Sequence, residues 1–148
     1  MEFSGYDLRM FECARQEAKK SDYKPFNLGC VVTYKGHIVG HGHNSNKTNP
    51  LQKKYNMRYR KFNSCNAKPI RHSIHAELSA LLSVPYAVGK DMDWSKASIY
   101  IYRISNGNKP YGYGCAKPCN ACAHALRDFG IKNIYYTDSM GLAYLRLD

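Results

Sequence analysis

Two short fragments constrain this chain more than any other part of its sequence. One is His75-Ala76-Glu77, and the other is Pro118-Cys119-Asn120-Ala121-Cys122. Together they offer an imidazole and two thiols, which can hold a zinc ion with one position open, and a carboxylate that can carry a proton beside it. A fold that uses both fragments must bring distant parts of the chain to one point.

The spacing of the two cysteines allows both thiols to bind one metal ion. On a helix, Cys119 and Cys122 would lie about 60° apart around the axis. Cys122 also belongs to an apolar stripe that continues to Phe129, so it should point inward. Pro118 fits a helix start, where its missing N–H costs little. A thiolate at Cys119 would be stabilised by the free N–H groups of that first turn.

His75 and Glu77 are two residues apart, and inside a helix they would diverge by about 200°. This spacing makes sense if the ion lies off the end of a helix that begins there. Zinc would then be bound by His75, Cys119 and Cys122, with water as fourth ligand, as in catalytic sites. Zinc lowers the pKa of bound water from 15.7 to about 7. Glu77 could pass that water's proton to a ring nitrogen and a leaving amine.

Other interpretations of these thiols remain open. Cys115 lies four residues before Cys119 and could complete a structural site of three cysteines and one histidine, but Glu77 would then have no role. A redox dithiol also fits the cysteine spacing, but it leaves His75 and Glu77 unexplained.

A second group of histidines alternates along an expected strand and therefore shares one face: His37, His41 and His43. A second metal held there with Cys65 or His72 is one hypothesis. The alternative is that they are ordinary partly buried or surface histidines.

The net charge of +11 is concentrated in one region. Residues 23–76 contain ten lysines and arginines and no acid, whereas the rest of the chain is nearly neutral. Such a region suggests a surface for phosphate, with Lys47 and Arg71 as candidate contacts because they lie near the motifs. The alternative is a solvated loop that aids solubility.

Aromatic residues interleave with these cations: Tyr55, Tyr59 and Phe62. Cations with stacking aromatics are typical of a groove that binds single-stranded nucleic acid, which would place the strand along residues 47–71. An amphipathic helix that packs on a neighbouring subunit would show the same pattern. The sequence leaves both interpretations open.

The apolar pattern predicts an α/β chain with helices at 7–20, 74–83 and 119–129 and strands at 28–34, 38–43, 98–104 and 131–137. A basic insertion at about 45–73 is expected to be a long polar loop. This order predicts one domain over residues 1–148, with helices on both faces of one sheet.

The end of the chain permits a sharper inference. Only ten residues follow Asp138. A parallel neighbour would need a crossover of about a dozen residues or more. If residues 142–147 form a strand, it should therefore be antiparallel to 131–137. A frayed tail or a short helix is the alternative.

The sequence also bears on location. No segment approaches about 18 consecutive apolar residues, so no membrane-spanning helix is expected. Met1–Met10 carries charges and lacks the apolar core of a secretory signal. Six cysteines without such a signal indicate a reducing compartment, and we expect a cytoplasmic protein.

The two fragments follow the pattern H-x-E…P-C-x-x-C of zinc-dependent base deaminases. With Asn27–Val32 and Gly42-His43-Asn44, in the same order, they make residues 26–137 resemble the cytidine deaminase superfamily. The resemblance implies a three-layer α/β/α sandwich with a five-stranded mixed sheet, one Zn²⁺ per chain and a homo-oligomer. It also implies hydrolytic removal of an exocyclic amine, most often from cytosine.

By the same resemblance, Asn44 would contact the sugar, the backbone of Ala76 the base, and the carbonyl of Lys117 the leaving amine. Relatives commonly carry Ser, Thr or Glu where this chain has Lys117, so only the backbone role carries over. The antiparallel last strand resembles the free-nucleoside branch. The run Gly42-His43-Asn44-Ser45 and the insertion resemble the deoxycytidylate branch.

Three functions compete. The first is deamination of a free cytosine nucleoside or nucleotide, with Tyr111 and Tyr113 lining the base pocket or merely packing a glycine-containing loop. The second is deamination of cytosine or adenine in single-stranded DNA or RNA. The third is a binding module that zinc only staples together, in which Glu77 would be dispensable.

Overall fold

The computed structural model describes residues 2–23, 25–60, 71–104 and 113–147. Within them the helices are α1 (Gly5–Ala18), α2 (Pro50–Tyr59), α3 (Ala76–Ser83), α4 (Tyr86–Gly89), the 3-10 turn η1 (Trp94–Lys96) and α5 (Asn120–Phe129). The strands are β1 (Asn27–Tyr34), β2 (His37–His43), β3 (Ser98–Ile104), β4 (Tyr113–Gly114), β5 (Asn133–Asp138) and β6 (Gly141–Arg146).

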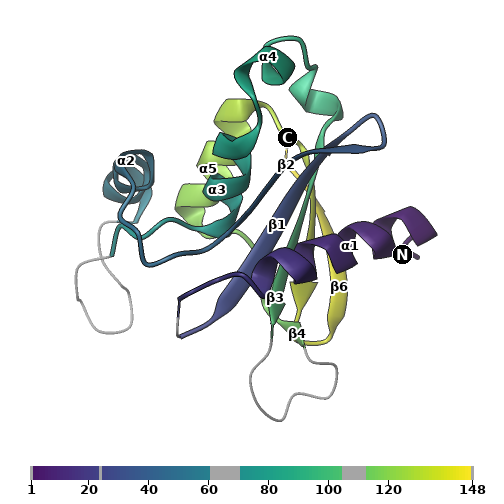
Figure 1. Ribbon diagram of the computed structural model, residues 1–148, viewed down its shortest axis with the longest axis horizontal. Coiled ribbons are helices and arrows are strands. Elements are labelled where there is room, and N and C mark those ends of the chain that lie inside the picture. The colour runs from purple at the N-terminus through teal and green to yellow at the C-terminus, as the bar shows by residue number, and fades with distance from the viewer. Residues whose placement is uncertain (1, 24, 61–70, 105–112, 148) are drawn as a thin grey trace.

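The strands form one mixed sheet in the order β2-β1-β3-β5-β6, with the two-residue β4 paired to β3. β1 is antiparallel to both β2 and β3, β3 is parallel to β5, and β6 returns antiparallel to β5. The predicted antiparallel last strand is therefore confirmed. Helix α1 lies on one face of the sheet, and α3 and α5 lie on the other, which gives the expected three layers (Figure 1).

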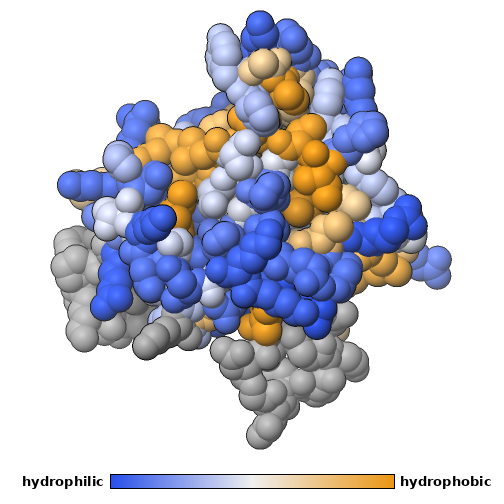
Figure 2. Space-filling model, viewed as in Figure 1, coloured by the Kyte–Doolittle hydropathy of each residue, from blue (hydrophilic) through white to orange (hydrophobic). Residues whose placement is uncertain are grey.

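Alternating residues of the central strands supply a core on each face. Val31 and Tyr100 pack with Phe11 of α1, whereas Cys30 and Ile99 belong to the larger cluster under α3 and α5. Since successive side chains of a strand point to opposite faces, strands covered on both sides are apolar throughout. The outer face of α1 is mostly hydrophilic, with Leu8 as an exposed apolar residue (Figure 2).

Two glycines let the helices lie close to the sheet. A Cβ on Gly29 would overlap the Ala14 carbonyl and the Ala18 amide of α1, and a Cβ on Gly42 would lie 2.6 Å from the Ala80 amide of α3. Because such distances are far inside van der Waals contact, only glycine allows these approaches. Gly42 thereby brings α3 against the edge strand β2.

The expectation of a structureless insertion is wrong, because residues 50–59 form α2. Asn49 caps this helix by accepting hydrogen bonds from the Leu51 and Gln52 amides, and Pro50 occupies the first turn. An Asn-Pro pair is typical of a helix start, but the polar and basic composition of the segment favoured a loop. In the part of the chain described, no helix is long and apolar enough to cross a membrane.

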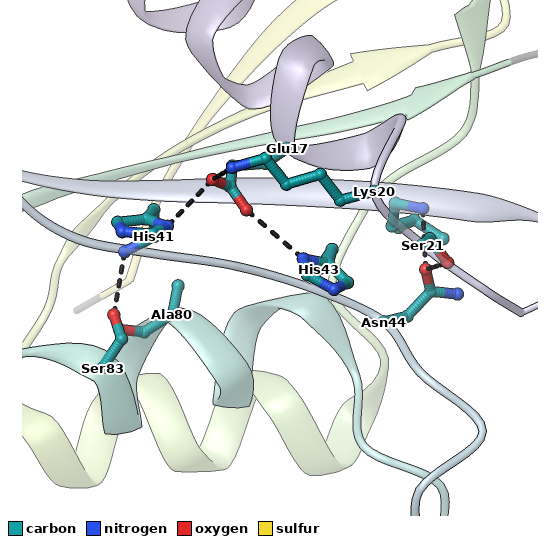
Figure 3. A network of polar contacts seen from close by, with 9 residues as sticks. Glu17, Lys20, Ser21, His41, His43, Asn44, Ala80 and Ser83 are labelled. Carbon is teal, nitrogen blue, oxygen red and sulfur yellow. Dashed lines mark hydrogen bonds and ion pairs between the residues drawn. The ribbon is translucent and has the colours of Figure 1, made fainter.

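A buried carboxylate ties the C-terminal end of α1 to β2 (Figure 3). Glu17 is only 7% exposed. Its carboxylate oxygens lie 2.8 Å from the Nδ1 atom of His41 and 3.3 Å from that of His43. They also form an ion pair with Lys20 Nζ at 2.9 Å. Burial opposes ionisation of Glu17, but hydrogen bonds from Lys20 and His43 and the charge of His41 outweigh it and lower its pKa.

The lowered pKa predicts a pH-dependent contribution to stability. A carboxylate with a depressed folded pKa stabilises the fold above its usual value of 4.5, and this stability is lost as the pH falls through the folded pKa. Glu17→Gln should lower the free energy of unfolding by about 1 kcal/mol near neutral pH, because the partners are partly exposed. Urea unfolding at a series of pH values measures it.

Glu12→Gln is the matched control, since Glu12 lies on the same helix with its side chain 56% exposed. It should change stability little at any pH. A difference between wild type and Glu17→Gln that stays constant from neutral pH down to about pH 3 would contradict this account.

Candidate metal centre and active-site cavity

The N-termini of α3 and α5 meet on the same side of the sheet. His75 is the N-cap of α3, but its side chain makes no capping hydrogen bond, which leaves the imidazole free for another partner. Cys119 is the N-cap of α5, and its Sγ accepts the Cys122 amide at 3.5 Å. The fold therefore presents an imidazole and two thiols from two helix starts.

These three side chains form a compact cluster. The Nδ1 atom of His75 lies 3.6 Å from Cys119 Sγ and 3.3 Å from Cys122 Sγ. Zinc with ordinary bond lengths in a tetrahedron separates a nitrogen and a sulfur ligand by about 3.5 Å, so the cluster fits this ion. Within the described ranges it is the one group that could hold a metal, and it supplies three ligands.

The structural four-ligand alternative receives no support. Cys115 is exposed and does not belong to the cluster. The redox alternative is not supported either, because His75 lies within 3.6 Å of both thiols and Glu77 lines the adjacent cavity, and a redox dithiol would leave these two residues without a role. Three protein ligands leave one position open, as in catalytic sites.

The environment favours a thiolate at this point. A hydrogen bond with Cys122 and the neighbouring His75 lower the pKa of Cys119, although burial acts in the opposite direction. The same bond, together with burial and the nearby Glu77, raises the pKa of Cys122. Arg60 adds positive charge, since its Nη1 lies 3.6 Å from Cys119 Sγ. A metal ion could therefore bind Cys119 as a thiolate without first displacing a proton.

Glu77 occupies the first turn of α3 and is only 4% exposed. Burial raises the pKa of this carboxyl, while the His75 imidazole lowers it to a smaller extent. A carboxyl with a raised pKa beside the metal ligands is suited to accept a proton and return it. The catalytic role of Glu77 stays a prediction.

A cavity of about 510 Å³ opens at the cluster. Its volume is in the range of small-molecule sites. Apolar and aromatic side chains form part of the wall: Tyr23, Phe26, Leu28 and Ile74. Four cationic residues also line it, namely Arg60, Arg71, Arg103 and Lys117. Of the described residues in the wall, Glu77 is the one acid.

The predicted substrate contacts are brought together in part. Ala76, Lys117 and Arg71 line the cavity. Lys47 is exposed and is absent from the wall, so its choice as a phosphate contact is not supported. Tyr111 lies outside the described residues, and Tyr113 begins β4.

Asn44 lines the cavity, but its amide is already engaged. Its Oδ1 accepts the Ser21 hydroxyl (Figure 3) and the Leu28 amide, and its Nδ2 donates to the Phe26 carbonyl at 3.1 Å. Asn44 therefore joins the start of β1 to the end of β2 and holds this part of the cavity wall in place.

The two described aromatic residues of the insertion, Tyr55 and Tyr59, do not form a stacking platform. Tyr55 is 7% exposed and donates its hydroxyl to Asp128 of α5 at 2.6 Å. Tyr59 stacks on His124 with ring centroids 3.6 Å apart. Both rings are committed to α5, and Phe62 lies outside the described residues. The pattern reflects packing within the chain.

A second metal site also lacks support. His41 and His43 face Glu17, and His72 lies 3.3 Å from the Asn56 amide. None of them forms a ligand group with other described residues. Cys65 lies outside those residues.

Two cationic residues of the wall, Arg103 and Arg60, are not predicted as site residues by the sequence. Arg103 comes from β3, which shows no motif, and its guanidinium lies 4.6 Å from the centroid of the Phe26 ring. Arg60 ends α2, and it was only one of many cations in the basic stretch. Neither position carries a spacing signal, because the wall is assembled from separate elements of the fold.

Comparisons with known proteins agree with this geometry. The profile of the cytidine and deoxycytidylate deaminase zinc-binding region matches residues 5–138. Within that zinc-binding region, His75, Cys119 and Cys122 are the side chains placed to hold the ion. No curated protein matches the sequence.

Several solved structures share the fold. Cytidine deaminase from Burkholderia pseudomallei is 16% identical with a TM-score of 0.59, over 97% of this chain and 93% of that one. The cyanophage S-TIM5 dCMP deaminase in complex with dCMP and dUMP is 17% identical with a TM-score of 0.56, over 93% and 85%. A structure of tRNA:A34 deaminases is 20% identical with a TM-score of 0.51, over 88% and 75%.

Proposed function

Because this chain belongs to the cytidine and deoxycytidylate deaminase zinc-binding family, we propose that it is a zinc-dependent hydrolase of cytosine nucleotides. The reaction consumes water, replaces the exocyclic amine of cytosine by oxygen and releases ammonia. The observation that carries the proposal is the buried carboxyl of Glu77 in one cavity with His75 and Cys119, which with Cys122 form the cluster.

The chemistry divides between the cluster and Glu77. His75, Cys119 and Cys122 would hold Zn²⁺, which when bound supplies the Lewis acidity that activates water near neutral pH. Glu77 would accept one proton from the attacking water and deliver it to the ring nitrogen. It would then accept the remaining proton of the hydroxyl group now bound to the ring carbon and deliver it to the amine, which leaves as ammonia. The raised pKa of Glu77 suits a group that must both accept and donate a proton.

Groups of the backbone orient the base. The family resemblance assigns the base to the Ala76 backbone and the leaving amine to the Lys117 carbonyl, and both residues line the cavity. By the same resemblance Asn44 would contact the sugar. It lines the cavity, and its hydrogen bonds to Leu28 and Phe26 hold the start of β1.

The charge of the wall favours a substrate that carries phosphate. In the described part of the chain, none of the four cations of the wall forms a salt bridge, since every ion pair involves Glu12 or Glu17. Arg60 contacts the Cys119 thiol, but a neutral nucleoside would give Arg71, Arg103 and Lys117 no anionic partner. A phosphate group would provide one through charge-assisted hydrogen bonds.

Arg103 is the best-fixed of these cations. Its guanidinium lies over the Phe26 ring and donates to the Cys115 carbonyl at 3.4 Å. Its stem crosses Gly114 of β4, where a Cβ would lie 2.7 Å from the Arg103 Cγ. A cation held in advance loses little conformational freedom on binding, so it is well suited to recognise phosphate.

A polynucleotide substrate is the second candidate. The exposed cations of α2 favour it, namely Lys53, Lys54 and Arg58. Against it, Tyr55 and Tyr59 are packed on α5 and cannot stack on bases. We therefore favour a mononucleotide.

Substrate conversion tests the chemistry. Zinc-loaded protein is incubated with cytidine, deoxycytidine, CMP, dCMP, adenosine, single-stranded DNA and RNA, and products are read by mass spectrometry. We expect conversion of a cytosine mononucleotide. Glu77→Gln should lower turnover by at least about 100-fold with zinc content unchanged, since the proton carrier is lost. Turnover retained in Glu77→Gln contradicts the mechanism.

Arg103→Gln tests phosphate recognition. We expect kcat/KM for dCMP to fall by about 10- to 100-fold, mainly through KM, because a charge-assisted hydrogen bond is lost. The value for deoxycytidine should change by less than about threefold. Lys90→Gln, an exposed cation outside the wall, is the control. An equal loss for both substrates would remove Arg103 from phosphate recognition.

A further inference from the structure

The inner face of α2 carries two buried amide side chains. Gln52 is 1% exposed and Asn56 is 0% exposed. They lie one helical turn apart, and the Gln52 Nε2 donates to the Asn56 Oδ1 at 3.0 Å. Amides are rarely enclosed so completely unless each polar atom has a partner, so their remaining hydrogen bonds indicate what they hold.

Those hydrogen bonds lead to the segment that carries His75. The Gln52 Oε1 accepts the backbone N–H of His75 at 3.0 Å. The Asn56 Nδ2 donates to the Arg71 carbonyl at 3.1 Å. The two amides thus form a continuous chain from the cluster residue His75 to the cavity residue Arg71.

The bond to His75 falls where it affects the direction of the imidazole. The side chain of His75 does not cap α3 because it faces the two thiols. Gln52 satisfies the backbone N–H of this N-cap residue from another helix. Holding the peptide group that enters His75 restricts the direction of its Cα–Cβ bond, and with it the positions from which the ring can reach the thiols.

Helix α2 is also anchored to the helix that carries the thiols. Tyr55 donates to Asp128, and the Asn120 side chain donates to the Tyr59 carbonyl at 3.2 Å. Figure 1 shows α2 beside α5 and the start of α3. One helix of the insertion therefore holds the imidazole side of the cluster through Gln52 and the thiol side through α5.

We propose that Gln52 is a positioning residue of the metal centre, through which α2 orients His75 and sets the affinity for zinc. This inference rests on the proposed function only in taking His75 as a zinc ligand, and it holds for any substrate. Zinc affinity is measured apart from turnover, so a protein that deaminates nothing could still confirm or refute it.

The test compares two substitutions on α2. Gln52→Met is close in shape but lacks the strong acceptor for the His75 N–H. Tyr55→Phe removes a hydrogen bond of the same helix to Asp128 and leaves Gln52 intact. In chelator competition with the full chain, Gln52→Met should bind zinc about 10- to 100-fold more weakly, as loss of outer-shell support does. Tyr55→Phe should stay within about twofold.

A spectroscopic measurement separates positioning from general loosening. With Co²⁺ in place of zinc, the absorption bands of Gln52→Met should shift or weaken, because a displaced imidazole alters the ligand field. Tyr55→Phe should keep the wild-type spectrum. Equal losses of zinc affinity in the two variants, or unchanged affinity and spectrum in Gln52→Met, would overturn the proposal.

Gln52→Glu supplies a rescue that covers poor folding of Gln52→Met. The carboxylate keeps an acceptor for the His75 N–H and loses the amide donor to Asn56. We expect Gln52→Glu to bind zinc within about threefold of wild type. If instead it binds zinc more than about 10-fold more weakly while remaining folded, the acceptor is not what positions His75, and the proposal fails.

Discussion

The convergence of two helix starts on one point is the constraint on which the rest of the structure depends. His75 and Cys119 are N-caps of α3 and α5, and both helices lie on the same face of the sheet. Gly42 lets α3 lie against β2. An N-terminal turn offers free N–H groups that favour anions, so thiolates are stabilised where the metal is needed. Moving either helix by one turn would separate the ligands.

The described wall of the cavity beside the metal cluster carries more cationic than acidic side chains. Glu77 is the one acid in the described wall, and burial holds its pKa high, whereas the cations of the wall lack acidic partners among described residues. The two features suit different parts of a nucleotide substrate. A carboxyl of raised pKa can exchange protons with the cytosine ring, and guanidinium groups without acidic partners can bind the phosphate.

Local spacing in the sequence predicted the cluster well, because each ligand motif begins a helix and its geometry is set within one turn. The antiparallel direction of the last strand also followed from the short turn before it, which leaves no room for a crossover. The role of α2 could not be read in this way. In the sequence, Gln52, Tyr55 and Asn56 look like residues of an exposed polar helix. In the fold they are buried because they hydrogen-bond to α5 and to residues 71–75. Arg103 became a site residue only because Phe26 and Gly114 hold it at the cavity.

X-ray absorption at the zinc edge tests the central claim most directly, since it counts the sulfur and imidazole ligands of the bound ion. The account predicts two sulfur atoms at about 2.3 Å and one imidazole nitrogen at about 2.0–2.1 Å. Cys115→Ser should leave that spectrum unchanged. Three or four sulfur ligands, or no imidazole, would contradict a centre built from His75, Cys119 and Cys122.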